Sequence, residues 1–271
     1  MSRGVGGRYV FVYEEWFGQW VHVDDRGWMI KGRVIRHDQI VGVLNRLVAL
    51  RKHEPSGSVY NNIVLFCNYL LDEVYPVVLN KPKYGMSNYS KLGQLVKVQD
   101  GILRKPQSEL LMNHFCNATR KKGAWIFKSA SSVRSRVAML TKAHKAEFVW
   151  EPVLFQPYLE GVNIRVHVVG DQCVAHRCDS DAVDYRYAKT TIHPCQLPIQ
   201  VAAGCIAVTK QLKLQFSGID LIQTEKGWVL LEVNTAPGFS YFEGDGDGVS
   251  ALLHQYLCKG VELTQKQGVE Q

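Results

Sequence analysis

Two stretches near the C-terminal end of the chain decide its fold: GIDLI over residues 218–222 and LLEVNTAPG over residues 230–238. The Glu-Lys-Gly sequence between them predicts a tight turn, so we expect the two stretches to pair as a hairpin. Residues two apart in a strand point to the same face, which puts Glu232 and Asn234 together. Asp220 can lie beside them on the paired strand.

These three side chains offer two carboxylates and one amide oxygen. Mg²⁺ prefers such oxygen ligands and keeps positions open for nucleotide phosphates. The alternative interpretation is a half-buried hairpin with acids on its solvent face. Burying polar groups inside so apolar a run is costly without a partner, which favours a metal site at Asp220, Glu232 and Asn234.

Two segments before this hairpin each carry a lysine, whose ammonium group binds anions as a point charge. Ser90-Lys91-x-x-Gln94 begins a predicted helix with Ser90 as its N-cap. Lys128 lies in a predicted strand that runs into the serine-rich turn 129–136. Backbone N–H groups and hydroxyls of such a turn suit phosphate oxygens.

Two more segments follow in the chain. FQPYLEG over residues 155–161 combines Pro157 with apolar and aromatic neighbours. NIRVHVVG over residues 163–170 alternates as a strand, and Gly170-Asp171 turns it into a second predicted hairpin. Arg165 within it suits phosphate oxygens, because a guanidinium pairs with them through its planar fork.

Taken in order, these segments resemble the ATP-grasp ligases, in particular the ribosomal-protein glutamate ligase branch, over about residues 77–257. The FQPYLEG segment resembles the hinge that holds adenine in this family, with Gln156 where many relatives have glutamate. Asn163 replaces an aspartate. The resemblance implies catalytic roles for Arg165 and Arg186, and metal binding by Asp220, Glu232 and Asn234. It implies ATP binding by one further set: Lys91, Lys128, Ser131, Ser132, Gln156, Pro157, Tyr158, Leu159 and Asn163.

The fold that this resemblance implies is an α+β ATP-grasp fold with three parts. We expect a small mixed N-terminal substrate lobe over residues 1–88, a central lid over residues 89–160 and a C-terminal catalytic lobe over residues 161–271. The nucleotide cleft is expected between the last two. ATP and Mg²⁺ are the implied cofactors, with two metal ions bound and Mn²⁺ as the alternative ion.

Composition sets wider limits. The chain has 271 residues, 46% of them hydrophobic and 21% charged, which excludes a disordered tail, a collagen and a coiled coil. The net charge of +7 favours an anionic partner or serves solubility alone. No apolar run approaches the roughly 20 residues of a membrane helix. Seven scattered cysteines indicate reduced thiols, and we expect a cytoplasmic protein without membrane contact.

The predicted function is an ATP- and Mg²⁺-dependent ligase that joins a carboxylate to an amine or hydroxyl through an acyl phosphate, releasing ADP and phosphate. The NIRVHVVG strand and the acidic stretch after it most resemble peptide-modifying members, the graspetide (microviridin-type) macrocyclases. Two other functions stay open: a small-molecule kinase and a non-catalytic nucleotide-binding module. The substrate can also be a small carboxylate or amine, and a homodimer stays open. The basic residues form no stripe, which argues against nucleic acid.

Overall fold

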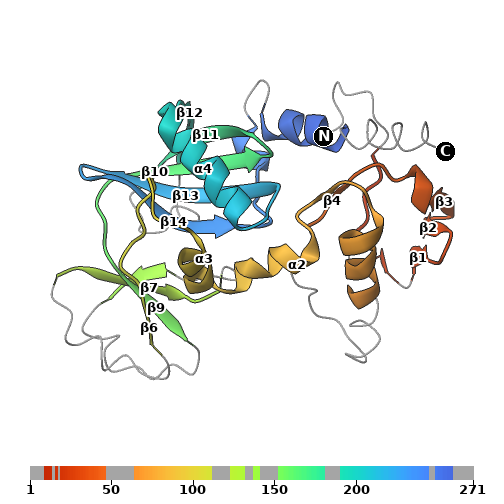
Figure 1. Ribbon diagram of the computed structural model, residues 1–271, viewed down its shortest axis with the longest axis horizontal. Helices are drawn as coiled ribbons and strands as arrows, with labels where there is room; N and C mark the ends of the chain where they lie inside the picture. Colours follow the sequence, from red (N-terminus) through yellow and green to blue (C-terminus); the bar gives the residue numbers. More distant parts are fainter. Residues whose placement is uncertain are drawn as a thin grey trace. The chain divides into compact units, whose positions relative to one another are not determined.

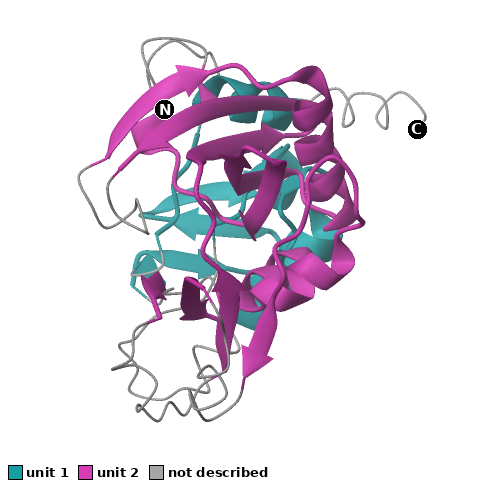
Figure 2. Cartoon of the chain, turned by 90° about the vertical axis from the view of Figure 1, so that its left-hand side faces the viewer, with its two compact units in different colours: residues 1–83, 250–271 teal, residues 84–249 magenta. Residues whose placement is uncertain are grey.

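The computed structural model describes residues 9–13, 16–17, 19–46, 64–111, 123–131, 137–140, 152–180, 190–243 and 248–258. The chain forms two compact units, residues 1–83 with 250–271 and residues 84–249 (Figure 2). Within the described ranges, no helix has both the length and the apolar character that crossing a membrane requires.

The first unit holds a three-stranded antiparallel sheet and a small parallel pair. The sheet contains β1 (Val21–Val23), β2 (Gly27–Ile30) and β3 (Arg33–Arg36), and η2 (His37–Gln39) follows it. The parallel pair joins β4 (Val43–Leu44) to β5 (Val78–Leu79). A helix over residues 64–69 runs into η3 (Leu70–Val74), whose leucines pack with Tyr75 and Val78 in the core of this unit.

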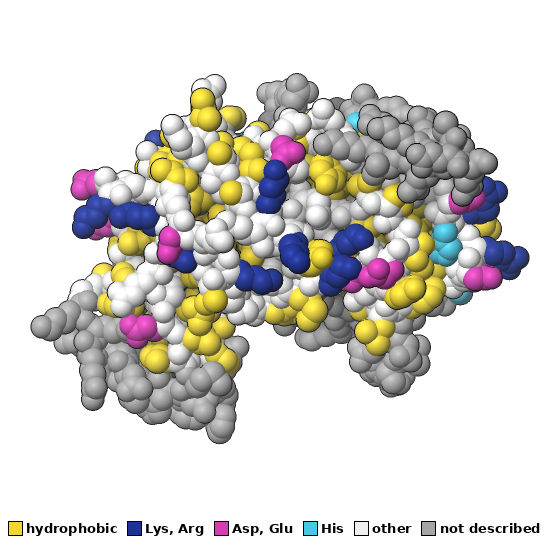
Figure 3. Space-filling view, in the orientation of Figure 1, with side chains coloured by type: hydrophobic (Ala, Val, Ile, Leu, Met, Phe, Trp, Pro, Cys, Tyr) yellow, Lys and Arg dark blue, Asp and Glu magenta, His cyan; other side chains and the backbone are white. Residues whose placement is uncertain are grey.

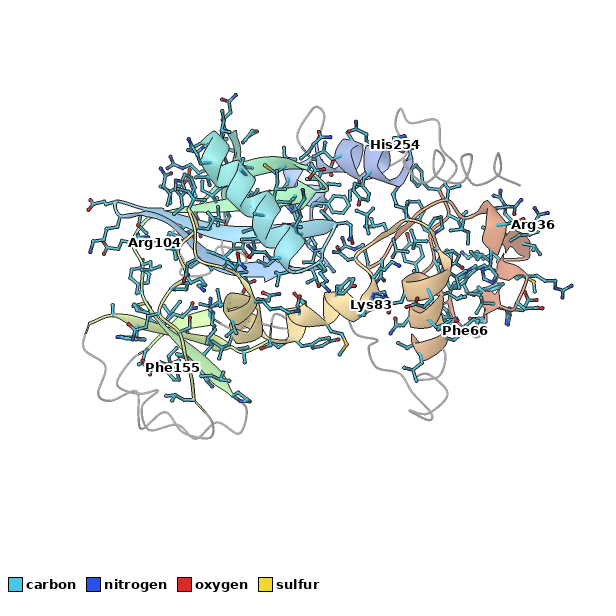
Figure 4. All side chains as sticks on the ribbon, viewed as in Figure 1. Arg36, Phe66, Lys83, Arg104, Phe155 and His254 are labelled. Carbon is cyan, nitrogen blue, oxygen red and sulfur yellow. The ribbon has the colours of Figure 1, made fainter. Side chains whose placement is uncertain are left out.

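The second unit begins with three short helical segments and continues with two antiparallel sheets (Figure 1). The helical segments are α2 (Pro82–Gly85), η4 (Met86–Tyr89) and α3 (Lys91–Lys97). The smaller sheet has the order β6 (Glu109–Leu111), β9 (Val153–Pro157), β7 (Trp125–Ser129) and β8 (Val137–Met139). Its core packs Val153 and Phe155 against partly buried apolar side chains, among them Phe127. Figure 4 labels Phe155 in this sheet.

The larger sheet has five strands. Their order is β12 (Thr191–Cys195), β11 (Gln172–Asp179), β10 (Val162–Val169), β13 (Phe216–Thr224) and β14 (Gly227–Asn234). α4 (Ile199–Gln211) covers one face of it, and η8 (Ser240–Phe242) comes after β14 (Figure 1). A closing helix spans residues 249–258, and from residue 250 onward it belongs to the first unit. Both predicted hairpins are present, β10–β11 and β13–β14.

Apolar residues at every second position hold α4 against this sheet. Val166, Ile219 and Val233 are fully buried on that face, and they share a cluster with Val201 and Cys205 of the helix. Burying apolar surface stabilises the unit by about 25 cal/mol per Å², so this cluster is its main source of stability. The alternation leaves the intervening positions of β10, β13 and β14 on the opposite face.

The two edge strands of the five-stranded sheet differ in how their outward backbone groups are kept from pairing with another strand. At β14, the Gln94 side-chain amide donates to Val233 O (2.7 Å) and accepts from Val233 N (3.2 Å). Arg104 pairs its backbone with Trp228 O and Leu230 N of the same edge. At the other edge, β12 has proline at position 194. Gln94 belongs to α3, whose predicted N-cap is confirmed because Gly93 N donates to the Ser90 hydroxyl.

Among the described residues on the face drawn in Figure 3, lysines and arginines lie at several separate places between apolar and uncharged groups. The six cysteines within the described residues have free thiols, as the sequence predicts. The five-stranded sheet and α3 contain half of the described residues that were selected from the sequence. The other half lie in the four-stranded sheet or shortly after its strands β7 and β9.

Candidate functional site

A row of polar side chains crosses the five-stranded sheet on the face opposite α4. Arg165 of β10 is the direct cross-strand partner of both His176 on β11 and Asp220 on β13, and Asp220 is in turn the partner of Glu232 on β14. Directly opposed residues of a ladder point to the same face. All four side chains are buried, with 5–7% of their surface exposed. Burial of so many ionisable groups in one row is costly without mutual pairing.

A β-bulge brings the two carboxylates to the same face. The ladder between β13 and β14 pairs Thr224 with Gly227 beside the turn, so an unbroken ladder would set Asp220 opposite Leu231. The register shifts after Asp220, and Glu232 takes that place instead. A bulge adds one residue to one strand, which reverses the facing of every later side chain. The prediction that Asp220 lies beside Glu232 is therefore met through an irregularity.

Arg165 and Asp220 form a buried ion pair, with Arg165 Nη1 donating to Asp220 Oδ1 at 2.9 Å. The guanidinium extends over Gly218, where a Cβ would collide with it and with Pro237. Glycine at this position therefore leaves the space that the guanidinium occupies. The pairing fixes Arg165 at the centre of the row.

Lys91, at the start of α3, binds the β14 end of the row. Its Nζ donates to the backbone oxygens of Ser129 (3.0 Å) and Ser131 (2.7 Å) and lies 3.5 Å from Glu232 Oε2. The Lys91 side chain is wholly buried. Its ammonium thus links α3, the end of β7 and the acidic end of the row.

Lys128 of β7 reaches the same part of β14. Its Nζ donates to Leu231 O at 3.4 Å, one residue before the carboxylate that Lys91 contacts, and the side chain is buried. The two lysines selected from the sequence come from separate elements, 37 residues apart in number, and meet at neighbouring residues of one strand.

The predicted hinge lies at the end of β9, before β10 begins. Gln156 is buried and donates from Nε2 to Ser108 Oγ at 2.8 Å. Tyr158 donates its backbone N–H to Ala124 O, so that donor already has a partner within the protein. Pro157 is the last residue of β9, and Leu159 follows partly exposed.

Two asparagines flank the row. Asn163 lies on β10, two residues before Arg165 and on the same face. Asn234 ends β14, and its Oδ1 accepts from Ala236 N at 3.0 Å. Among the described residues, no three His, Cys, Asp or Glu side chains gather as a metal site. The oxygen donors suited to Mg²⁺ are therefore two carboxylates, Asp220 and Glu232, with Asn234 next along the strand.

Ser132 and Arg186 lie outside the described residues, so the structure does not place them. Ser131 lies within them, and it contributes its backbone oxygen to Lys91.

Neither His167 nor His176 is among the site residues predicted from the sequence. His167 follows Arg165 by two positions, and that spacing alone puts the two side chains on one face. His176 could also have been found. The turn at Gly170-Asp171 sets a register in which Arg165 and His176 are opposed.

Both histidines pack around one aromatic ring. The Phe242 ring lies 4.9 Å from the His167 ring and 5.3 Å from the His176 ring, centroid to centroid. His167 shares a hydrogen bond of 3.0 Å between Nε2 and Gly238 O. A carbonyl only accepts, so Nε2 carries the proton and Nδ1 is left as an acceptor.

Burial keeps these imidazoles neutral. It lowers the pKa of His167 to about 3, and the nearby charge of Arg165 acts in the same direction. It also lowers the pKa of His176, an effect that the Glu243 carboxylate partly opposes. Within the described residues, Nδ1 of each histidine is buried without a hydrogen-bond partner. Two neutral proton acceptors therefore lie beside Arg165.

Comparison with protein families matches residues 118–250 to the RimK-like ATP-grasp domain. A probable alpha-L-glutamate ligase 2 of Shewanella amazonensis is 30% identical over 117 residues, which cover 40% of this chain and 39% of that protein. The chain thus matches less than half the length of this curated relative.

Solved structures match over a longer span. The ATP-grasp ligase PsnB complexed with minimal precursor, Mg and ADP has a TM-score of 0.71 at 22% identity, covering 91% of this chain and 87% of that one. The macrocyclase MdnC of Microcystis aeruginosa MRC, bound with precursor peptide MdnA, has a TM-score of 0.73 at 17% identity, covering 91% and 89%. At these identities the similarity establishes the fold.

Proposed function

We propose that this protein, which has the ATP-grasp fold and carries a RimK-like ATP-grasp domain, is an ATP-dependent ligase that joins a carboxylate to an amine or hydroxyl group. The fold predicted from the sequence is confirmed by the comparisons. The observation that carries the function is the buried row Arg165–Asp220–Glu232 with Lys91 at its acidic end.

The chemistry of the row supports phosphoryl transfer to a carboxylate. Lys91 and Lys128 would neutralise phosphate charge, since catalysis of this reaction is mostly positioning and electrostatic stabilisation. Arg165 would stabilise the acyl phosphate and the tetrahedral species that follows. Residues 89–160 then act as the lid and residues 161–271 as the catalytic lobe. The hinge 156–159 and Asn163 would contact the nucleoside, with Ser131 and Ser132 near the phosphates.

A divalent cation fits the donor set. Asp220, Glu232 and Asn234 supply oxygen atoms, which is the ligand type that Mg²⁺ takes. Mg²⁺ held there would screen the negative charge of the nucleotide phosphates during transfer. A related structure contains Mg and ADP. Our proposal includes two Mg²⁺ ions, with Mn²⁺ as a substitute.

A peptide is the proposed substrate class. PsnB and MdnC were solved with precursor peptides, and the net charge of +7 suits a peptide with acidic side chains. Arg186 lies in the stretch proposed to contact this substrate.

The test is incubation with ATP, Mg²⁺ and synthetic peptides that contain glutamate together with lysine or threonine. We expect ADP and phosphate in equal amounts, and a peptide that has lost one water per ATP. Release of AMP would contradict the acyl phosphate route. Transfer of the labelled γ-phosphate to a stable product would indicate a kinase, and nucleotide binding without turnover would indicate a non-catalytic module.

A matched pair of variants ties the activity to the row. Asp220→Asn should abolish turnover, because it removes a charge from the proposed metal site and from Arg165. Asp171→Asn changes an aspartate in the turn of the same sheet, whose side chain is 72% exposed, and it should leave turnover unchanged. Equal activity of the two variants would refute the role of the row.

A further inference from the structure

The polar row has a direction. From the β14 edge inward it runs Lys91, Glu232, Asp220, Arg165 and then His176, so that charged groups suited to phosphate and metal occupy one end and a neutral imidazole the other. Arg165 stands between them, paired to Asp220 on one side and opposite His176 on the other.

This order separates the two reactants of a ligase. If the nucleotide phosphates lie at the lysine end, the acyl group that receives the γ-phosphate lies at Arg165. The acceptor adds to the acyl carbonyl carbon to give a tetrahedral species, from which the phosphate then leaves. It must therefore enter from the side of Arg165 that the nucleotide phosphates do not fill. His176 is the titratable side chain that faces Arg165 from the neighbouring strand on that side.

The two histidines differ in access. His167 has no exposed surface, and its Nε2 is bound to Gly238 O. His176 keeps 5% of its surface exposed, and its Nδ1 is buried without a partner within the described residues. Phe242 packs against both rings and limits their movement. His176 is therefore the better placed of the two to meet a substrate.

We propose, on the basis of the ligase function above, that His176 is a catalytic residue that accepts the proton of the attacking amine or hydroxyl group. The acceptor's lone pair forms the new C–N or C–O bond to the acyl carbon. Its proton passes to an imidazole nitrogen of His176. The bond from the acyl carbon to the phosphate oxygen breaks, and phosphate leaves with that electron pair.

The surroundings of His176 suit this role. Arg165 faces His176 from β10, and the rings of His167 and His176 both contact the Phe242 ring. The Glu243 carboxylate, which follows η8, raises the pKa of His176. Burial favours a neutral imidazole before attack. Glu243 favours the imidazolium that forms on proton transfer, as a carboxylate does beside a catalytic histidine.

Hydroxylamine separates this role from the earlier steps. It is uncharged at neutral pH and attacks an acyl phosphate without help from a base. A glutamate-rich peptide without lysine, incubated with ATP, Mg²⁺ and hydroxylamine, reports acyl phosphate as hydroxamate. A peptide with glutamate and lysine reports the complete reaction. The wild-type protein tests the proposed function: if it makes neither product, that function is wrong and the role of His176 is refuted with it.

The decisive variant is His176→Asn. We expect its amide formation to fall about a hundredfold or more, the usual contribution of a general base, while hydroxamate formation stays at the wild-type rate. His193→Asn is the control, because His193 is an exposed histidine of β12 in the same sheet, and both rates should stay unchanged. Thermal melting checks that each variant is folded, and His176→Gln replaces the asparagine variant if that one does not fold.

Three results would overturn the assignment. Unchanged amide formation in the folded His176 variant would show that no proton goes there. An equal loss of amide and hydroxamate would show that His176 supports the site as a whole. A loss of the same size in His193→Asn would show that the sheet, not this side chain, is sensitive.

Discussion

The two faces of strands β10, β13 and β14 are both buried, yet they are built from opposite chemistry. One face packs Val166, Ile219 and Val233 under α4. The other carries Arg165 and Asp220 with less than a tenth of their surface exposed. An antiparallel sheet usually buries one apolar face and leaves its polar face in water.

The difference shows which face of the sheet stabilises the fold and which face gives up stability for function. The apolar face needs only volume and shape to stabilise the unit. The polar face requires each charge to find a partner, which Arg165 finds in Asp220 and Lys91 in Glu232. Changes on the two faces should therefore have separable effects, and the following variants test that separation in order of expected size.

The largest effect is expected for Glu232→Gln on the polar face. Loss of this charge should lower Mg²⁺-dependent ATP turnover by about a hundredfold or more, equivalent to several kcal/mol of transition-state stabilisation. The melting temperature should fall as well, because buried Lys91 loses its carboxylate. Steady-state ADP release and thermal melting measure the two effects. Glu225→Gln, in the exposed turn, is the control, and undiminished turnover in Glu232→Gln would remove this carboxylate from the site.

On the apolar face, Ile219→Ala should lower the free energy of unfolding by about 3 kcal/mol, through lost burial and the cavity that remains. Turnover per folded molecule should not change. Urea unfolding and an activity assay at low temperature separate the two. Ile199→Ala on α4 removes the same atoms from a side chain that is 85% exposed, so it should be almost neutral. A loss of specific activity in folded Ile219→Ala would show that the faces are coupled.

At the sheet edge, Gln94→Ala should cost about 2 kcal/mol, because it leaves the N–H and C=O of Val233 buried without their hydrogen bonds. Hydrogen exchange should speed up at Val233 in particular. Gln223→Ala, an exposed glutamine on β13, is the comparison. If Val233 exchanges no faster in the Gln94 variant, the side chain does not protect that edge.

The smallest effect concerns pH. His167 has a folded-state pKa of about 3, below the ordinary value of 6.5. Below pH 6.5 the unfolded chain binds a proton that the folded protein does not, so stability falls as the pH is lowered from 6.5 towards 3. Between pH 7 and pH 5.5 this residue should cost about 1 kcal/mol.

His167→Phe removes that dependence, whereas His193→Gln, on an exposed histidine, should keep it. Urea unfolding at the two pH values provides the measurement. An unchanged pH dependence in His167→Phe would mean that this histidine titrates normally.

Local patterns in the sequence predicted much of the fold. The Ser90 cap, the turn after β10 and the hairpin of β13 and β14 follow from turn chemistry and alternation. The same patterns put Glu232 and Asn234 on one face. They predicted the correct pairing of the two strands, but turn geometry alone would have set Asp220 opposite Leu231.

The remaining features depend on contacts that local sequence does not encode. The bulge after Asp220 sets the two carboxylates opposite each other, and no turn residue in the sequence indicates this bulge. Lys91 and Lys128 meet β14 from more than a hundred residues away, which follows only from how the sheets pack. The family resemblance identified both lysines, but their present partners could be found only in the folded chain.

Backbone hydrogen bonding at the two edges of the five-stranded sheet affects how copies of this protein can associate. A strand edge with open N–H and C=O groups invites a second molecule to add its own strand. Here Gln94 and Arg104 already bind the outward groups of β14, and Pro194 on β12 has no N–H to offer. Extension of this sheet by another copy would break existing bonds at one edge and meet a missing donor at the other. Any homodimer should therefore form through packed side chains on another surface, and concentrated protein should resist strand-to-strand aggregation at this sheet.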